Sequence, residues 1–484
     1  MSINPNIVLL KQRRTKIVAT IGPRSRNAIA IRGLIDAGVD VFRLNMSHGV
    51  AAEHADAIGM IRDYAAISGR PIGVLADLCG PKIRTGKFIG DSVALVTGAV
   101  VTVTTREVLG TACLIPSQYR ALASDVQRGD RILLNDGAAE LVVEAVEDSE
   151  VRCRVIAGGP VGNHKGINLP GVKVSAPSLT ERDIEDAKFA LKQEVDFIAL
   201  SFVRTRADID ALRAVVAMQA SRPALIAKIE KPEALVNSIE IIQAADGIMV
   251  ARGDLGVELN PEQVPLAQSQ LIHYARLHDK PVIVATQMLE SMISNARPTR
   301  AEVTDVSHAV AAGADAVMLS GETAVGAHPE AAVGMMVRIA HQTEAYYVQN
   351  RLPFGLPRIG TVNEAVPFGD AIANSVAQLV IETQAKAVVV ISMQGMTATT
   401  ISAARPNAPI VAISRFATTC RRLNLLWGVI PYVDDAAGAE NPNLVARRAV
   451  LNLDLARSGE FVVLVRGFHS DPELNTPTIT LLCI

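Results

Sequence analysis

Short apolar runs alternate with amphipathic stretches along most of the chain, and this rhythm predicts β-strands that are each followed by an α-helix. The runs are almost continuously apolar, which strands of a parallel sheet need when both faces of the sheet are covered. Eight such runs occupy residues 16–22, 39–45, 72–78, 195–202, 224–230, 245–252, 281–287 and 315–321. Eight βα units of this kind predict a (β/α)8 barrel, or TIM barrel.

The rhythm breaks once, between the third and fourth runs, for about 90 residues, which is too long for a simple βα connection. Residues 81–167 are rich in Val and Thr and carry a turn signal at Asn135-Asp136-Gly137, so they predict a small β domain inserted after strand 3. Without this insert, the 15–345 region has about 245 residues, close to the usual size of a (β/α)8 barrel.

A second α/β region follows a link that contains Pro and Gly at 352–360, where apolar runs and helical stretches resume. We therefore expect a separate C-terminal α/β domain. The predicted division is 1–80 for the first part of the barrel, 81–167 for the inserted β domain, 168–350 for the second part of the barrel and 351–484 for the C-terminal domain.

Composition excludes several classes of partner. The formal net charge of -2 gives no basic surface of the kind that binds nucleic acid or an anionic membrane. No apolar run approaches the roughly 18 residues that span a bilayer, and the N-terminal segment lacks the pattern of a signal peptide. Five scattered cysteines without CxxC spacing fit a reducing compartment. We expect a cytoplasmic protein with no nucleic-acid or membrane partner.

Polar residues end nearly every predicted strand. In a parallel barrel these residues and the loops after them meet at one face, where chemistry takes place. Any one of them could be a helix cap or a satisfied turn residue, so the prediction of a site rests on the whole set. The set is Arg43, Asn45, Asp77, Ser201, Lys228, Glu230, Arg252, Thr286, Ser320 and Glu322.

Lys228 and Glu230 are the most specific pair in this set. Alternate residues of a strand face the same side, so both side chains point into the barrel mouth. Asp254 follows the next strand, and two carboxylates from adjacent strands predict a Mg²⁺ site. A structural ion pair between Lys228 and Glu230 is the alternative. Gly253 permits close approach to the backbone, and the residues after it predict a short helix whose N–H groups can hold a carboxylate or phosphate.

Nine ordered motifs resemble the pyruvate kinase family, closely from Thr15 to about Tyr347 and more loosely beyond. They are TKIVATIGP (15–23), VFRLNMSHG (41–49), GPKIRTG (80–86), KGINLPG (165–171), IAKIEKPEAL (226–235), DGIMVARGDLGVEL (246–259), ATQMLESM (285–292), RPTRAEVTDV (297–306) and MLSGETAVG (318–326). The resemblance implies an enzyme that transfers the phosphoryl group of phosphoenolpyruvate to ADP, giving pyruvate and ATP in the last step of glycolysis.

The resemblance also implies roles for the residues at the strand ends. Arg43 would hold the phosphoryl oxygens, and Lys228 would neutralise charge as the enolate leaves. Glu230 and Asp254 would carry Mg²⁺ or Mn²⁺. The substrate carboxylate would bind the backbone of Gly253 and Asp254 and the Thr286 hydroxyl. Thr286, Ser320 and Glu322, through a water chain, would protonate the enolate.

The same resemblance assigns a nucleotide site. Asn45, His48, Arg84 and Lys165 match positions that touch the nucleotide, and the last two reach it when the inserted domain closes as a lid. Closure excludes water that would compete with ADP. Direct attack by ADP needs no nucleophilic Ser, Cys or His from the protein.

One residue departs from the potassium-dependent members of the family. Asn45, Ser47, Asp77 and the carbonyl of Leu78 match the oxygen ligands of the family's monovalent-cation site. The position of Lys82 is glutamate in potassium-dependent members, and a lysine there can supply the positive charge itself and repel a cation. We expect that potassium can bind but is not required. The alternative is that Lys82 points to solvent.

The C-terminal domain carries a stretch, SMQGMTATT (392–400), that resembles the family's effector loop, with Ser392, Gln394, Gly395 and Thr397 as phosphate-binding residues. An ordinary βα turn is the alternative. The loop at 467–477 lacks the basic or Gly-rich character expected for gripping a bisphosphate, so we expect a sugar monophosphate or no effector. The resemblance implies an allosteric homotetramer.

Two other functions are alternatives to phosphoryl transfer for such a barrel. A metal-dependent aldolase or lyase would stabilise the same enolate, but Arg84 and Lys165 on an inserted lid disfavour it. A non-catalytic metabolite-binding barrel is disfavoured by the complete set of Lys228, Glu230, Asp254 and Thr286.

Overall fold

The computed structural model describes residues 10–135, 137–217, 222–356, 367–469, 471, 473 and 475–484. Asp136 of the predicted turn, part of the 352–360 link and part of the 467–477 loop lie outside the described residues. Eight parallel strands form a closed barrel in which the last strand pairs with the first, so the predicted fold is confirmed. The barrel strands are β1 (Lys16–Thr20), β2 (Val41–Asn45), β3 (Gly73–Asp77), β12 (Phe197–Leu200), β13 (Ala224–Ile229), β14 (Gly247–Ala251), β15 (Val282–Ala285) and β16 (Ala316–Leu319).

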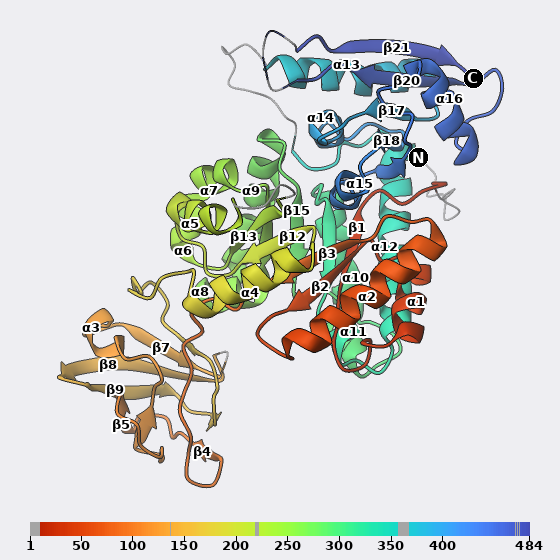
Figure 1. Ribbon diagram of the computed structural model, residues 1–484. Coiled ribbons are helices and arrows are strands. Elements are labelled where there is room, and N and C mark those ends of the chain that lie inside the picture. Colours follow the sequence, from red (N-terminus) through yellow and green to blue (C-terminus); the bar gives the residue numbers. More distant parts are fainter. Residues whose placement is uncertain are drawn as a thin grey trace.

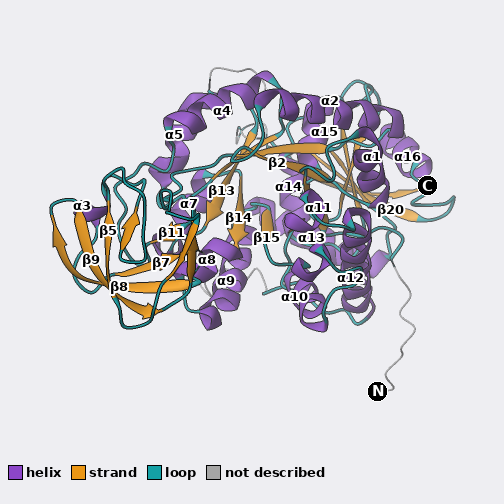
Figure 2. Ribbon diagram, turned by 90° about the horizontal axis from the view of Figure 1, so that it is seen from below, coloured by secondary structure: helices purple, strands orange, loops and turns teal. Residues whose placement is uncertain are grey.

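Helices cover the outside of the barrel (Figure 2). Several begin at a side chain that caps the first turn: Thr180 and Thr299 each accept a hydrogen bond from a backbone N–H three residues later. The helices are α1 (Ala28–Ala37), α2 (Ala51–Ser68), α4 (Glu181–Lys192), α5 (Arg206–Val216), α6 (Pro232–Val236), α7 (Ser238–Ala244), α8 (Arg252–Glu258), η1 (Pro261–Gln263), α9 (Val264–Leu277), η2 (Glu290–Ile293), α10 (Arg300–Ala311), α11 (Gly321–Ala324) and α12 (Pro329–Gln349).

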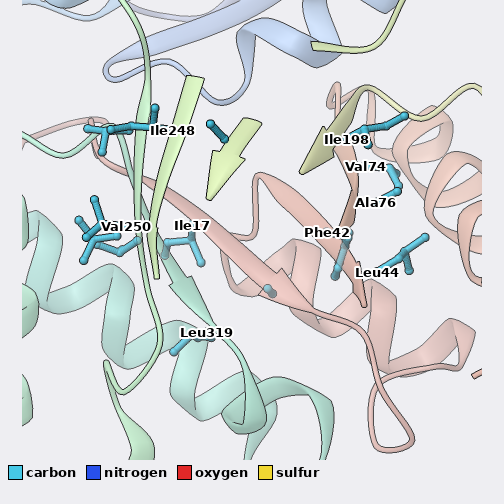
Figure 3. Packing of buried hydrophobic residues seen from close by; sticks show 14 of the residues in the cluster. Ile17, Phe42, Leu44, Val74, Ala76, Ile198, Ile248, Val250 and Leu319 are labelled. Carbon is cyan, nitrogen blue, oxygen red and sulfur yellow. The ribbon is translucent and has the colours of Figure 1, made fainter. Parts of the chain in front are cut away.

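Both faces of the barrel strands are buried, as the continuous apolar runs require. Residues such as Ile17, Phe42 and Ile248 face the surrounding helices (Figure 3). Their neighbours in sequence, such as Val18 and Met249, pack together inside the barrel. This alternation explains why the runs contain so few polar residues before the strand ends.

The inserted domain is a separate β structure with its own apolar core. It contains a six-stranded sheet, a two-stranded sheet and one short helix. Its elements are β4 (Ser92–Ala94), β5 (Val100–Thr104), β6 (Leu114–Pro116), α3 (Leu122–Asp125), β7 (Arg131–Leu134), β8 (Ala139–Glu147), β9 (Glu150–Ala157), β10 (Pro160–Gly162) and β11 (Ile167–Asn168). Figure 1 shows this domain on the opposite side of the barrel from the C-terminal domain.

The C-terminal domain has a five-stranded sheet with helices on both faces, four strands being parallel and the edge strand β21 antiparallel. Its elements are α13 (Phe368–Thr383), β17 (Val388–Ile391), α14 (Met396–Ala403), β18 (Ile410–Ser414), α15 (Ala417–Leu423), β19 (Val429–Val433), α16 (Pro442–Asn452), β20 (Phe461–Arg466) and β21 (Thr478–Cys483). Within the described residues, no helix is both long and apolar enough to cross a bilayer.

This domain covers the amino ends of the barrel strands. Arg421 pairs with Asp196, which precedes β12, at 2.7 Å. Asn424 donates a hydrogen bond to the carbonyl of Asp40, which precedes β2, at 2.8 Å. Leu425 inserts into the apolar interior of the barrel. The carboxyl ends of the strands therefore stay open on the side of the inserted domain.

Candidate active site

A small cavity of about 80 Å³ lies at the carboxyl ends of the barrel strands. The ends of β2, β3, β13, β14 and β15 supply most of its polar lining, because parallel strands all end at this face. The structure thus brings together residues that are far apart in sequence: Arg43, Asp77, Lys82, Ser201, Lys228, Glu230, Asp254 and Thr286.

Asp77 is the centre of an ion-pair network in this cavity. Its carboxylate lies 2.6 Å from Nε of Arg43 and 3.2 Å from Nζ of Lys228. Lys228 Nζ also pairs with Glu230 at 2.9 Å and donates a hydrogen bond to Ser201 Oγ at 2.7 Å. The ion pair between Lys228 and Glu230, which was the alternative to a metal site, is therefore present, but as one part of a larger network that also fixes Arg43.

The network sets the charge of each group. Burial disfavours the ammonium of Lys228, but the carboxylates of Asp77 and Glu230 outweigh burial and raise the pKa of Lys228. For Asp77, burial is likewise outweighed, because Lys228 and Arg43 lower its pKa. Burial raises the pKa of Glu230, the Lys228 charge lowers it, and the negative charge of Asp254 raises it further. Lys228 is a fixed cation at neutral pH.

Glu230 and Asp254 fit a divalent cation. Glu230 accepts a hydrogen bond from the N–H of Phe202 at 2.7 Å, which orients its carboxylate. Across the part of the chain that the structure describes, the Asp254 carboxylate has no hydrogen bond or ion pair, and no group of three His, Cys, Asp or Glu side chains is placed to hold a metal. Two carboxylates suit Mg²⁺, which keeps most positions for water and substrate. A cation beside them would relieve the repulsion between the two carboxylates, which adds to the effect of burial in raising the pKa of Glu230.

The end of β15 is strained. Thr286 and Gln287 have φ of 70° and 54°, a left-handed conformation that is costly for a β-branched residue. The N–H of Gly253 donates to Thr286 Oγ1 at 2.7 Å, and this hydroxyl donates to the carbonyl of Ala285 at 2.6 Å. The N–H and hydroxyl that the resemblance assigns to the substrate carboxylate are thus paired with each other in the structure.

Arg252 holds this strained turn. Its guanidinium donates to the carbonyl of Thr286 at 2.8 Å and pairs with Asp305 at 2.7 Å. The sequence marked Arg252 only as one polar strand end among many. Its motif position, directly before Gly253, was the signal that could have shown its role beside Thr286.

Ser320 and Glu322 lie at the end of β16. Glu322 is buried and accepts hydrogen bonds from the N–H groups of Ser320, at 2.7 Å, and Leu289, at 3.1 Å. It therefore links the segments that follow β15 and β16. Neither residue is among those that line the small cavity, whereas Thr286 is.

A larger cavity of about 530 Å³ lies between the inserted domain and the barrel. His48, Arg84 and Lys165 line it, so three of the four residues predicted to touch a nucleotide come together. Lys82, Phe202 and Asp254 line both cavities, so the two cavities are adjacent. Asn45 does not line the larger cavity; its side-chain oxygen accepts a hydrogen bond from the N–H of Ser47 at 3.1 Å.

Positive charge dominates the lining of this larger cavity. Arg204 and Lys231, which the sequence analysis did not single out, line it together with Lys82, Arg84 and Lys165. Burial and then the charges of Lys82 and Arg84 lower the pKa of His48, so its imidazole is neutral at pH 7. A cavity of this size and charge can hold a nucleoside diphosphate.

Other groups already use most of the oxygens of the expected monovalent-cation site. Lys82 Nζ donates to Ser47 Oγ at 3.3 Å, so its ammonium is directed at this site. Ser201 Oγ donates to the carbonyl of Leu78 at 2.7 Å, and Asp77 pairs with two cations.

The 392–397 turn joins β17 to α14. Ser392 Oγ accepts a hydrogen bond from the N–H of Gly395 at 3.1 Å, and Gly395 has φ of 100°, which favours glycine. Thr397 is buried and Gln394 is exposed. The turn therefore closes partly on itself.

Two family models match the chain. "Pyruvate kinase, barrel domain" matches residues 12–333, and "Pyruvate kinase, alpha/beta domain" matches residues 370–481. Together they cover the barrel with its insert and the C-terminal domain.

Curated relatives and a solved structure agree with these models. A pyruvate kinase of Corynebacterium efficiens is 44% identical over 460 residues, which are 94% of each chain. A pyruvate kinase of Mycobacterium tuberculosis is 42% identical over 461 residues, 94% of this chain and 95% of the relative. The crystal structure of a pyruvate kinase from Cryptosporidium parvum matches with a TM-score of 0.88 and 36% identity, covering 98% of both chains. The chain therefore belongs to the pyruvate kinase family and has the phosphotransferase activity of that family.

Proposed function

We propose that the Asp77-centred network is the phosphoryl-transfer site. Arg43 binds the oxygens of the transferring phosphoryl group of phosphoenolpyruvate, and Lys228 neutralises the charge that develops on the enolate oxygen. The observation that carries this assignment is that Asp77 holds both cations in one cavity, at 2.6 and 3.2 Å. Asp77 acts as a positioning residue, because its carboxylate fixes the two groups that touch the substrate.

Glu230 and Asp254 would hold Mg²⁺ or Mn²⁺ in this site. The metal ion supplies positive charge for the phosphoryl and enolate oxygens. The proposal is supported by the free carboxylate of Asp254 within the described residues and by the raised pKa of Glu230.

Manganese binding tests the metal assignment without relying on turnover. In a titration of free Mn²⁺ followed by electron paramagnetic resonance, Asp254→Asn should lose the tight site of the wild type. Glu240→Gln, which changes an exposed carboxylate on α7, is the matched control and should keep it. Equal Mn²⁺ affinity in both variants would remove Asp254 from the site.

The substrate carboxylate would bind beside Gly253, Asp254 and Thr286. This requires the Thr286 hydroxyl and the Gly253 N–H to exchange their mutual hydrogen bond for bonds to the substrate. Thr286 would also deliver a proton to the enolate carbon, with Ser320 and Glu322 behind it. The link between Glu322 and the segment after β15 supports this order.

ADP would bind in the larger cavity, with Arg84 and Lys165 on the lid side and His48 and Asn45 on the barrel side. The adjacency of the two cavities, which share Asp254 in their lining, supports direct attack of the nucleotide on the phosphoryl group. ATP and pyruvate are the products. Closure of the inserted domain, which we place at 81–167 between barrel segments 1–80 and 168–350, would exclude water.

Potassium would not be required. The hydrogen bond from Lys82 to Ser47 supports an ammonium in place of the cation.

The C-terminal domain, 351–484, would bind a sugar monophosphate at the 392–397 turn, if it binds any effector. It would also join four copies into a cytoplasmic homotetramer. Thr397→Glu should abolish activation by a sugar monophosphate and keep basal activity. Light scattering of the purified chain tests the tetramer.

A further inference from the structure

A second large cavity, of about 520 Å³, lies far from the active site, between the segment before β1, the end of α12 and the C-terminal domain. The described N-terminal segment runs beside the C-terminal domain in Figure 1. Because β1 begins only two residues after Arg14, this cavity belongs to the amino end of the barrel. The volume falls within the roughly 300–1,000 Å³ that small-molecule sites occupy.

Among the described residues, four cations and no carboxylate line this cavity: Lys11, Arg14, Arg351 and Lys386. Two of them are partly neutralised, since Lys11 pairs with Asp454 at 2.6 Å and Lys386 with Glu460 at 3.6 Å. The guanidinium of Arg351 has no hydrogen bond or ion pair with any residue that the structure describes. The described lining therefore carries more positive charge than its ion pairs neutralise.

Arg14 is the unusual member of the four. Only 4% of its surface is exposed, and its Nε and Nη1 are buried without a hydrogen-bond partner in the described part of the chain. The carboxylate of the nearby Glu344 accepts hydrogen bonds from the backbone N–H groups of Arg14 and Thr15, at 2.8 and 2.6 Å. Burial lowers the pKa of Arg14 to about 10, against the charge of Glu344. An unpaired buried guanidinium is costly, and an anion beside it would offset that cost.

The rest of the lining suits an organic molecule. Val348, Ile381 and Leu455 give an apolar wall, and the amides of Gln384 and Asn407 can bond to hydroxyl groups. Guanidinium groups favour phosphate, which accepts their paired N–H donors. We propose that this cavity binds a small phosphorylated metabolite, whose phosphate contacts Arg14 and Arg351 and whose organic part packs on the apolar wall. The bound molecule would bridge the barrel and the C-terminal domain.

Phenyl phosphate and inorganic phosphate are suitable probes, because they separate the contribution of the apolar wall from that of the cations. In isothermal titration calorimetry, phenyl phosphate should bind the wild type more tightly than inorganic phosphate does. Arg351→Glu should weaken both by about tenfold or more, the scale of one lost charge-assisted contact. Trp427, the chain's only tryptophan, precedes Gly428, whose N–H donates to the Arg14 carbonyl at 2.8 Å, so its fluorescence should report binding here.

Two controls locate the binding. Arg447→Glu changes an exposed arginine on α16 that does not line the cavity, and Thr397→Glu changes the 392–397 turn; both should keep wild-type affinity. Arg351→Glu should keep wild-type turnover without phosphate, which shows that it is folded. The proposal fails if neither probe binds at millimolar concentration, or if Arg351→Glu and Arg447→Glu bind phenyl phosphate equally well. Loss of binding in Thr397→Glu alone would place the phosphate at the turn instead.

Discussion

The two ends of the barrel differ in how the protein satisfies their buried carboxylates. At the amino end, Asp196 pairs with Arg62 and Arg421 and accepts the N–H of Val74 at 2.9 Å. Asp315 pairs with Arg405 at 3.0 Å and accepts two N–H groups in the same manner. These carboxylates are saturated by the protein itself. They fix the C-terminal domain to the barrel.

At the carboxyl end the charges are not saturated. Asp254 has no partner among the described residues, and burial together with Asp254 raises the pKa of Glu230 against the effect of Lys228. Strain is also located here, at Thr286. The carboxylates at the amino end are thus satisfied by the protein itself, whereas Glu230 and Asp254 at the carboxyl end carry charge that we propose is met by metal and substrate. Substitutions at the carboxyl end should therefore change catalysis, and substitutions at the amino end should change stability.

The largest effect is expected for Lys228→Met. Removing the ammonium at the carboxyl end should lower kcat by about 100-fold or more, because it removes charge stabilisation of the transition state. The thermal midpoint and Mn²⁺ binding should change little, since Arg43 still pairs with Asp77. Steady-state kinetics with scanning calorimetry check both. Turnover near that of the wild type would remove Lys228 from the mechanism.

Leu425→Ala, at the amino end of the barrel, should change the stability of the protein and leave catalysis unchanged. Leu425 is fully buried inside the barrel, so truncation should lower the stability by about 2–5 kcal/mol. The KM for both substrates should stay close to the wild-type value. Leu444→Ala, at an exposed leucine on α16, should change stability by less than about 0.5 kcal/mol. Equal thermal midpoints for the two variants would contradict the packing of Leu425 in the barrel.

Arg84→Ala and Lys165→Ala separate nucleotide binding from phosphoenolpyruvate binding at the carboxyl end of the barrel. Each should raise the KM for ADP by about tenfold, because each removes a cation from the larger cavity. Binding of phosphoenolpyruvate, measured without nucleotide, should be unaffected. Unchanged ADP kinetics in both variants would reject the lid assignment.

The smallest effect is expected for Lys82→Glu. The wild type should reach full activity in a tetramethylammonium salt at constant ionic strength. The variant should need potassium, because it replaces the ammonium beside Ser47 with a negative charge. A many-fold stimulation of the wild type by potassium would show that Lys82 does not substitute for the cation.

Much of this contrast could be predicted from the sequence. The barrel strands were predictable because both faces of each are apolar, as Ile17 and Val18 show. Lys228 and Glu230 were predictable because alternate strand residues share a face. The family motifs then supplied Arg43, Thr286 and the nucleotide residues.

Other features depend on tertiary packing that no local pattern records. Leu425 follows α15 in an apolar stretch typical of any core, so nothing in the sequence shows that it enters the barrel of another domain. The bond from Arg252 to the strained Thr286 joins residues 34 positions apart. Asp77 was assigned to the monovalent-cation site, and its pairing with both Arg43 and Lys228 appears only when β2, β3 and β13 are placed in the closed barrel.

The most direct test of the central claim, that the unsaturated carboxyl end transfers a phosphoryl group between phosphoenolpyruvate and ADP, is pyruvate release coupled to lactate dehydrogenase. Pyruvate should form only when phosphoenolpyruvate, ADP and Mg²⁺ are all present. Omission of any one should reduce the rate to background. Pyruvate formation without ADP would contradict the account, because the chain would then act as a hydrolase or lyase and the larger cavity would have no part in the reaction.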